Sequence, residues 1–307
     1  MARHKHLANR PPFWFLTGSM DRDFSNHMRT LLGLSRVSGL PTVWSSCLAG
    51  WWLGGGGNFW ELSWLLTGMS AIYLGGCFLN DVFDVEFDRQ FNLKRPIPLG
   101  AIARQEVLNW ASAWLALGGL CLFPIGFSTG LLGLMLIGCV VVYNALHRTV
   151  TISAWLLGLC WFLVYPISAA TGFNGISGWG IWFGVSLGIY ATGCGFFARR
   201  KSSREQMSPW PIPFLGFPVF FALLINSGAY RQTAVMASMF LMAWIAFCIR
   251  PLFQQPNANR RNASARLFAG IVLVDWLAVA PLCPPKMHVI FWSLFGFALL
   301  AQRFLDR

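Results

Sequence analysis

Long apolar runs recur from one end of this 307-residue chain to the other. Each run holds about 17 to 21 residues, close to the ~20 that a helix needs to cross a bilayer core of roughly 30 Å. With 56% hydrophobic and 11% charged residues, the chain has too few polar side chains to cover a water-facing globule. We therefore expect an all-α membrane protein, a bundle of nine to ten transmembrane helices. The ten candidate spans are 37–56, 62–80, 107–126, 130–147, 153–172, 179–198, 212–228, 233–250, 267–283 and 287–304.

The basic residues indicate how the chain lies in the membrane. If the N-terminus is cytoplasmic, all of the 23 Lys and Arg residues except Arg231 and Lys286 fall on the cytoplasmic side. Short cytoplasmic loops carry such an excess, so we expect a multi-pass protein of the bacterial inner (plasma) membrane with the loops at 81–106, 199–211 and 251–266 in the cytoplasm. Membrane lipid is then the expected partner of these charges, and nucleic acid is not, because no recognition module is visible.

The chain shows no linker long enough to separate two domains. We expect residues 37–307 to form a single transmembrane domain. Residues 1–36 are a basic cytoplasmic segment whose aromatic patch at 13–16 is too short to span, so an interfacial helix is the preferred interpretation. The eight cysteines are scattered singly among apolar residues, which is typical of packing rather than of metal binding.

Acidic residues concentrate in one short segment. Of the eleven acids in the chain, four lie within residues 81–88. Asp81, Asp84 and Asp88 are three and four positions apart, so a helix would place all three on one face, with Asn80 beside them. Carboxylate oxygens at a membrane edge suit Mg²⁺, which prefers one or two carboxylates together with substrate phosphates. The segment therefore predicts a Mg²⁺ site on Asp81, Asp84 and Asp88 that receives a diphosphate.

Basic residues follow these acids. Lys94 and Arg95 precede a rigid turn at Pro96 and Pro98, within reach of phosphate oxygens. The alternative is a solvated helix end whose acids pair with Arg89, Lys94 and Arg95 as surface salt bridges. That alternative does not explain why the three aspartates share a face, so we favour the metal site.

Acids and bases together make one longer pattern. It reads Asn80-Asp81-x-x-Asp84-x-x-x-Asp88, followed by Arg95-Pro96-x-Pro98-x-Gly100. At the end of a second span, this pattern resembles the first signature of the UbiA superfamily of intramembrane prenyltransferases. Weaker similarities lie at Arg36, at Tyr143 to His147-Arg148 and at Gly158. The resemblance implies a ring of helices around a central, lipid-accessible cavity, with two acidic loops facing each other across its cytoplasmic mouth.

The second acidic loop of that family is missing from this chain. The end of the sixth span reads Ala198-Arg199-Arg200-Lys201, so bases stand where the family has aspartates. In this respect the chain resembles the divergent EboC-like branch of the superfamily. The basic loop is either a replacement that neutralises the diphosphate directly or an ordinary cluster of cytoplasmic charge.

The resemblance implies an enzyme that moves a polyprenyl group from its diphosphate to a small lipophilic acceptor, aromatic or hydroxyl-bearing, with Mg²⁺ as cofactor. Asp81, Asp84 and Asp88 are its expected catalytic and metal-binding residues. The expected substrate-binding residues are Asn80, Lys94, Arg95, Arg36, His147, Arg148, Arg199, Arg200 and Lys201. Candidate aromatic shields for the carbocation are Phe87, Tyr143, Trp161, Tyr165 and Tyr190. Because the second motif is missing, a non-catalytic protein that binds or transports an isoprenoid lipid is the alternative.

Asp275 lies in the middle of a predicted span. A charge at that depth costs roughly 2.5–3.5 kcal/mol, so we expect the side chain to face the protein interior. It would there contact the acceptor or form a hydrogen bond to a neighbouring helix.

Overall fold

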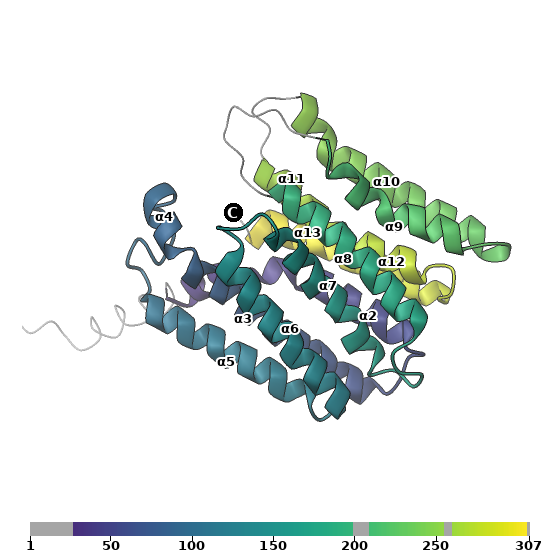
Figure 1. The fold of residues 1–307 in the computed structure, drawn as a ribbon, viewed down its shortest axis with the longest axis horizontal. Helices are drawn as coiled ribbons and strands as arrows, with labels where there is room; N and C mark the ends of the chain where they lie inside the picture. Colours follow the sequence, from purple (N-terminus) through teal and green to yellow (C-terminus); the bar gives the residue numbers. More distant parts are fainter. Residues whose placement is uncertain (1–26, 199–208, 255–259, 306–307) are drawn as a thin grey trace, which may run out of the picture.

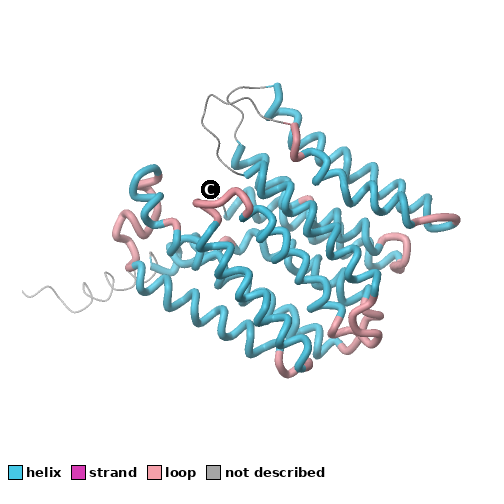
Figure 2. Tube along the Cα trace, in the orientation of Figure 1, coloured by secondary structure: helices cyan, strands magenta, loops and turns pink. Residues whose placement is uncertain are grey.

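The computed structural model describes residues 27–198, 209–254 and 260–305. Helices joined by loops make up these ranges (Figure 2), which confirms the all-α prediction for the described part of the chain. Residues 27–35 are helical and lead into the first named element. The elements are η1 (Val37–Gly39), α2 (Leu40–Leu53), α3 (Phe59–Phe83), α4 (Val85–Phe91), α5 (Arg104–Leu122), α6 (Phe127–Leu146), α7 (Ser153–Ala169), α8 (Gly178–Ala198), α9 (Ile212–Ile225), α10 (Ala229–Gln254), α11 (Arg260–Ala269), α12 (Ile271–Val279) and α13 (Pro285–Leu305).

The prediction of nine to ten spans is wrong for the described residues, in which six helical stretches are long and apolar enough to cross a membrane. These are α3, α6, α8, α10, α13 and the stretch Asn262–Val279, which covers most of α11 and all of α12. Of the other predicted spans, α2 and α9 have 14 residues and α7 has 17. At about 1.5 Å per residue they reach about 21 to 26 Å, short of a ~30 Å bilayer core.

Sequence hydropathy overestimated these spans because the apolar runs continue into turns. The predicted span 37–56 ends in a glycine turn, where Gly55 and Gly56 have φ angles of 92° and 67° that end the helix. The fifth helix, α5, is 19 residues long but begins with Arg104 and Glu106 in its first turn, which lowers its hydropathy.

Two apolar cores hold the bundle together. One joins α2, α3, α5, α6 and α7, and Leu31 and Leu34 of the N-terminal helical segment also belong to it. The other joins α2 and α7 to α8 through α13, with α12 buried along its whole length. Figure 1 shows α5 along one side of the molecule and α9 and α10 along the other. The partly buried Leu48, Trp52 and Trp161 pack against both cores.

Glycines allow the closest helix contacts. Gly158 of α7 faces Gly188 of α8, and a Cβ atom at Gly158 would collide with the Gly188 carbonyl and the Thr192 hydroxyl. Gly68 and Gly118 form the same kind of contact between α3 and α5. These backbones pack against each other because neither residue has a side chain, as is common between membrane helices.

Asp275 lies inside the bundle, with 0% of its surface exposed. Its Oδ2 accepts hydrogen bonds from Ser45 Oγ at 2.6 Å and Ser46 Oγ at 2.8 Å, and its Oδ1 accepts one from Tyr165 Oη at 2.9 Å. Both serine hydroxyls also lie within hydrogen-bond distance of the Thr42 carbonyl, at 2.9 and 3.1 Å. The interior orientation is confirmed, and the structure gives Asp275 the hydrogen-bonding role that joins α12 to α2 and α7.

Candidate active site

The acidic segment lies at one end of the bundle, where α3 ends and α4 begins. Helical hydrogen bonds continue through this junction, from Asp84 N to Asn80 O at 2.9 Å and from Asp88 N to Asp84 O at 2.8 Å. Asp81, Asp84 and Asp88 are 4%, 2% and 3% exposed. Burial of three acids at a helix end differs from the solvated surface that the salt-bridge alternative assumes, but Arg95 does pair with Asp81 and Asp88 as that alternative predicts. The charge of the acids therefore depends on the groups packed around them.

Asp81 is held through one of its two oxygens. Its Oδ1 accepts from Arg36 at 3.0 Å and from Arg95 at 3.1 Å. Its Oδ2 is buried and has no hydrogen-bond partner among the described residues. A buried carboxylate oxygen without a partner is costly, and a cation would satisfy it.

Asp84 points to the end of α6. Arg148 donates to both of its oxygens, at 2.7 and 2.5 Å, and His147 Nε2 lies 2.9 Å from Oδ1. Arg148 also stacks on the ring of Phe87, 4.2 Å from its centroid. Burial opposes ionisation of Asp84, but the hydrogen bonds from Arg148 and His147 outweigh it and hold the pKa of this carboxyl below its usual value.

This lowered pKa predicts how acid affects the fold. Because the folded-state pKa of Asp84 lies below the usual value of 3.8, ionised Asp84 stabilises the protein above pH 3.8, and this contribution is lost as the pH falls below that value. In Arg148→Met we expect a smaller loss of thermal stability between pH 6 and pH 3 than in the wild type. Arg89→Met is the matched control, since Arg89 pairs with the exposed Glu86. Equal losses in wild type and Arg148→Met would contradict the assignment.

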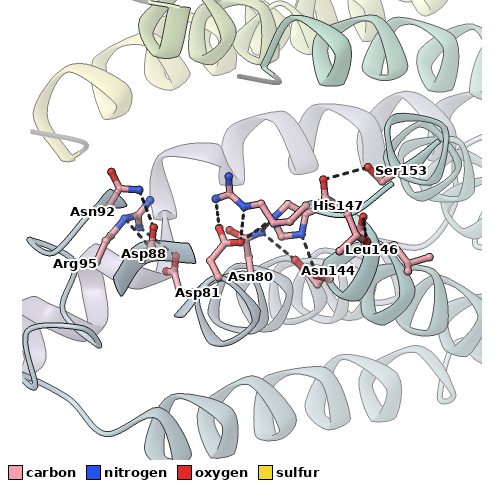
Figure 3. Close-up of polar contacts among 12 residues, drawn as sticks. Asn80, Asp81, Asp88, Asn92, Arg95, Asn144, Leu146, His147 and Ser153 are labelled. Carbon is pink, nitrogen blue, oxygen red and sulfur yellow. Dashed lines mark hydrogen bonds and ion pairs between the residues drawn. The ribbon is translucent and has the colours of Figure 1, made fainter. Parts of the chain in front are cut away.

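Asp88 and Asp81 line the same small recess. Asp88 accepts from Asn92 Nδ2 at 2.8 Å, and its Oδ2 lies 3.9 Å from Arg95 Nε. Figure 3 shows Asn92, Arg95 and Asp88 grouped on one side of Asp81, with Asn80 on its other side. The recess is lined by Leu34, Asp81, Asp88, Arg95, Pro96, Ile97 and Pro98. It thus combines two acids with a guanidinium and the rigid turn predicted from the sequence.

The donor set at this recess fits Mg²⁺. No group of three His, Cys, Asp or Glu side chains in the described ranges is arranged to hold a metal ion, and Asp84 faces Arg148. Mg²⁺ does not require such a group, since it binds one or two carboxylates and completes its shell with water and substrate phosphates. Asp81, with its unpartnered oxygen, and Asp88 are the residues that would hold it. The metal-binding role predicted for Asp84 stays a prediction, since Arg148 donates to both of its oxygens here.

The remaining predicted site residues are placed as follows. Lys94 is exposed beside the recess. Residues 199–208 lie outside the described residues, so Arg199, Arg200 and Lys201 stay a prediction. Of the aromatic candidates, Phe87 and Tyr143 lie next to Arg148 and His147, and Trp161 is partly buried between the two cores. Tyr165 and Tyr190 are fully buried and donate hydrogen bonds to Asp275 and to the Leu267 carbonyl.

One site residue was not predicted. Asn144 of α6 is 3% exposed and accepts a hydrogen bond from Asn80 Nδ2 at 3.1 Å (Figure 3). Its backbone carbonyl lies 2.9 Å from His147 Nδ1. An asparagine near the end of an apolar helix was the only signal in the sequence, and it does not indicate a partner 64 positions away.

Comparisons with known proteins find similar sequences and similar folds. The family model described as the UbiA prenyltransferase family matches residues 40–268. A digeranylgeranylglyceryl phosphate synthase from Ignicoccus hospitalis is 43% identical over 61 residues, 20% of each chain. A 4-hydroxybenzoate octaprenyltransferase from Salmonella paratyphi B is 27% identical over 160 residues, 51% of this chain and 54% of the relative. The matches thus span a fifth and about half of these relatives' lengths.

Solved structures show the same fold. A structure concerning digeranylgeranylglyceryl phosphate synthase in membranes superposes with a TM-score of 0.55 at 14% identity, covering 89% of this chain and 99% of the other. A UbiA homologue from Archaeoglobus fulgidus gives a TM-score of 0.50 at 15% identity, with 89% and 98% coverage. At these identities the likeness concerns the fold alone.

Proposed function

Because this chain belongs to the UbiA prenyltransferase family, whose members transfer prenyl groups, we propose that it moves a polyprenyl group from its diphosphate to a small lipophilic acceptor with Mg²⁺ as cofactor. The observation that carries this proposal is the recess at the end of α3. There the unpartnered oxygen of Asp81 lies beside Asp88, and Arg95 contacts both acids. Acidic side chains that could bind a metal and a basic side chain that could bind a diphosphate thus lie together at this recess.

The acidic and the basic residues around the recess would have different roles. Asp81 and Asp88 would hold Mg²⁺, which, when bound, neutralises charge on the leaving diphosphate. Arg36 and Arg95 each donate to Asp81 through a single nitrogen. We propose that their other N–H groups donate to phosphate oxygens of the substrate. Positive charge aimed at a departing diphosphate favours cleavage of the allylic C–O bond, the step that makes the prenyl group electrophilic.

A second group of side chains, formed by Asp84, Phe87, His147 and Arg148, would act at the edge of the same site. Arg148, held flat on Phe87 and bidentate to Asp84, is fixed in orientation. It adds positive charge on the α6 side of the acids, where His147 Nε2 also lies 2.9 Å from Asp84 Oδ1. We propose that these two side chains and the basic residues 199–201 assist diphosphate binding in place of the missing second acidic loop. The prenyl chain would extend between the helices toward the partly buried Trp161.

Diphosphate release tests the function. The purified protein in lipid nanodiscs is given geranyl, farnesyl or geranylgeranyl diphosphate with a panel of phenolic and polyol acceptors, with Mg²⁺ or with excess EDTA. We expect diphosphate release and a prenylated acceptor with Mg²⁺ only. Tight Mg²⁺-dependent binding of all three donors without turnover would instead favour a protein that binds or transports an isoprenoid lipid.

A further inference from the structure

Asn144 occupies a position with a single permitted side-chain orientation. Its Nδ2 lies 2.9 Å from the Val140 carbonyl and 3.4 Å from the Gly76 carbonyl, on two different helices. Carbonyl oxygens only accept hydrogen bonds, so the amide nitrogen must face them and Oδ1 must face away. Residues next to Asn144 in the sequence do not by themselves determine this orientation of the side-chain amide. The packing of α6 against α3 determines it, because that packing brings the Gly76 carbonyl next to Nδ2.

Asn80 takes its orientation from both of its neighbours. Its Nδ2 donates to Asn144 Oδ1 at 3.1 Å, and its Oδ1 accepts from Arg36 at 2.9 Å. The Arg36 guanidinium only donates, so Asn80 cannot be turned over without losing both bonds. Hydrogen bonds therefore run in one direction, from Arg36 through Asn80 and Asn144 to the carbonyls of α3 and α6.

Arg36, the first donor of this series, also holds Asp81. The same Arg36 nitrogen that donates to Asn80 also donates to Asp81 Oδ1, at 3.0 Å. Arg36 has a left-handed backbone, with φ 46°, and its carbonyl accepts from Tyr73 Oη at 3.2 Å. A residue held in this uncommon conformation, with its guanidinium shared between Asn80 and Asp81, keeps Oδ1 occupied. Oδ2 of the same carboxylate is buried and has no hydrogen-bond partner among the described residues.

We infer that Asn144 is a positioning residue, which acts through Asn80 and Arg36 to present the free oxygen of Asp81 to the metal-bound diphosphate. The inference rests on the proposed function, since it assigns Asn144 to the same site. It deepens that proposal by adding a residue of α6 that touches neither metal nor substrate. Arg95 also holds Oδ1 of Asp81, so loss of Asn144 weakens the site without abolishing it.

The test measures binding as well as turnover. In nanodiscs, the dissociation constant for geranyl diphosphate is determined by calorimetry with Mg²⁺ present, for the wild type, Asn144→Leu and Asn144→Asp. We expect each variant to bind about fivefold to tenfold more weakly, the worth of roughly one hydrogen bond. Asn226→Leu is the matched control, because Asn226 donates to the Ala222 carbonyl four residues earlier, as Asn144 does to Val140, but lies at the other end of the bundle.

A second comparison separates positioning from general damage. If Asn144 acts through Asn80, then Asn144→Leu has little further effect on binding in an Asn80→Ala background, whereas general loosening of α6 would add to it. Binding by Asn144→Leu equal to that of the wild type, or fully additive effects in the double variant, would overturn the inference. Wild-type protein that binds no geranyl diphosphate with Mg²⁺ would overturn the proposed function itself, an outcome that the single variants cannot imitate.

Discussion

Replacing Asp81 with alanine is expected to lower Mg²⁺-dependent diphosphate release by about 10²- to 10³-fold, the usual cost of removing one preorganised electrostatic group from an active site. The variant loses the carboxylate oxygen that has no partner among the described residues and leaves Arg36 and Arg95 without their shared acceptor. The measurement is the rate of diphosphate release at saturating Mg²⁺ with the donor that the wild type prefers.

Glu86→Gln is the matched control for Asp81→Ala. Glu86 lies in the same acidic segment, but its side chain is 71% exposed and pairs with Arg89 at the surface. We expect this variant to keep wild-type activity, because exposed ion pairs contribute little. Equal losses in the two variants would mean that the total negative charge of the segment matters, and the specific role assigned to Asp81 would be wrong.

Replacing Asp275 with alanine is expected to destabilise the fold by about 3 kcal/mol, since each buried donor left without an acceptor costs roughly 1–3 kcal/mol. Ser45 and Ser46 can turn their hydroxyls to the Thr42 carbonyl, whereas Tyr165 loses the acceptor that the structure gives it. The change also leaves a void among α2, α7 and α12. Thermal unfolding in nanodiscs measures the effect.

Asp275→Asn should retain most of the stability that Asp275→Ala loses. The asparagine oxygen still accepts from Tyr165, and its amide nitrogen can donate to a serine whose hydroxyl has turned to Thr42. Ser63→Ala serves as the control for an exposed hydroxyl that bonds only within its own helix. If Asp275→Ala unfolds at the wild-type temperature, the hydrogen bonds around this acid do not stabilise the helix packing.

The arrangement of the acidic segment could be predicted from the sequence because it depends on residues that are close together in the chain. The spacing of Asp81, Asp84 and Asp88 depends only on helix geometry, and the structure places them on a nearly continuous helical path. Arg95 follows soon after the acids and directly precedes the rigid turn at Pro96 and Pro98, so its proximity to the acids was also expected. Local spacing did not reveal that Asp84 turns away to Arg148 while Asp81 and Asp88 share the recess.

Contacts between distant helices could not be predicted. Asn144 meets Asn80 only because α6 packs against α3, and Asp275 meets Ser45 and Ser46 across 230 and 229 positions of sequence. Hydropathy likewise located the apolar runs but not the lengths of the helices within them. The glycine turn after α2 lies inside an apolar run, so the run is longer than the helix.

Each aspartate of the acidic segment already lies beside a cationic side chain of the protein itself. Asp81 has Arg36 and Arg95, Asp84 has Arg148, and Asp88 has Arg95 nearby. The repulsion among the three acids is therefore offset before any cofactor arrives. We therefore expect the fold to persist in a chelating buffer, so that different divalent ions can be compared on the same folded protein.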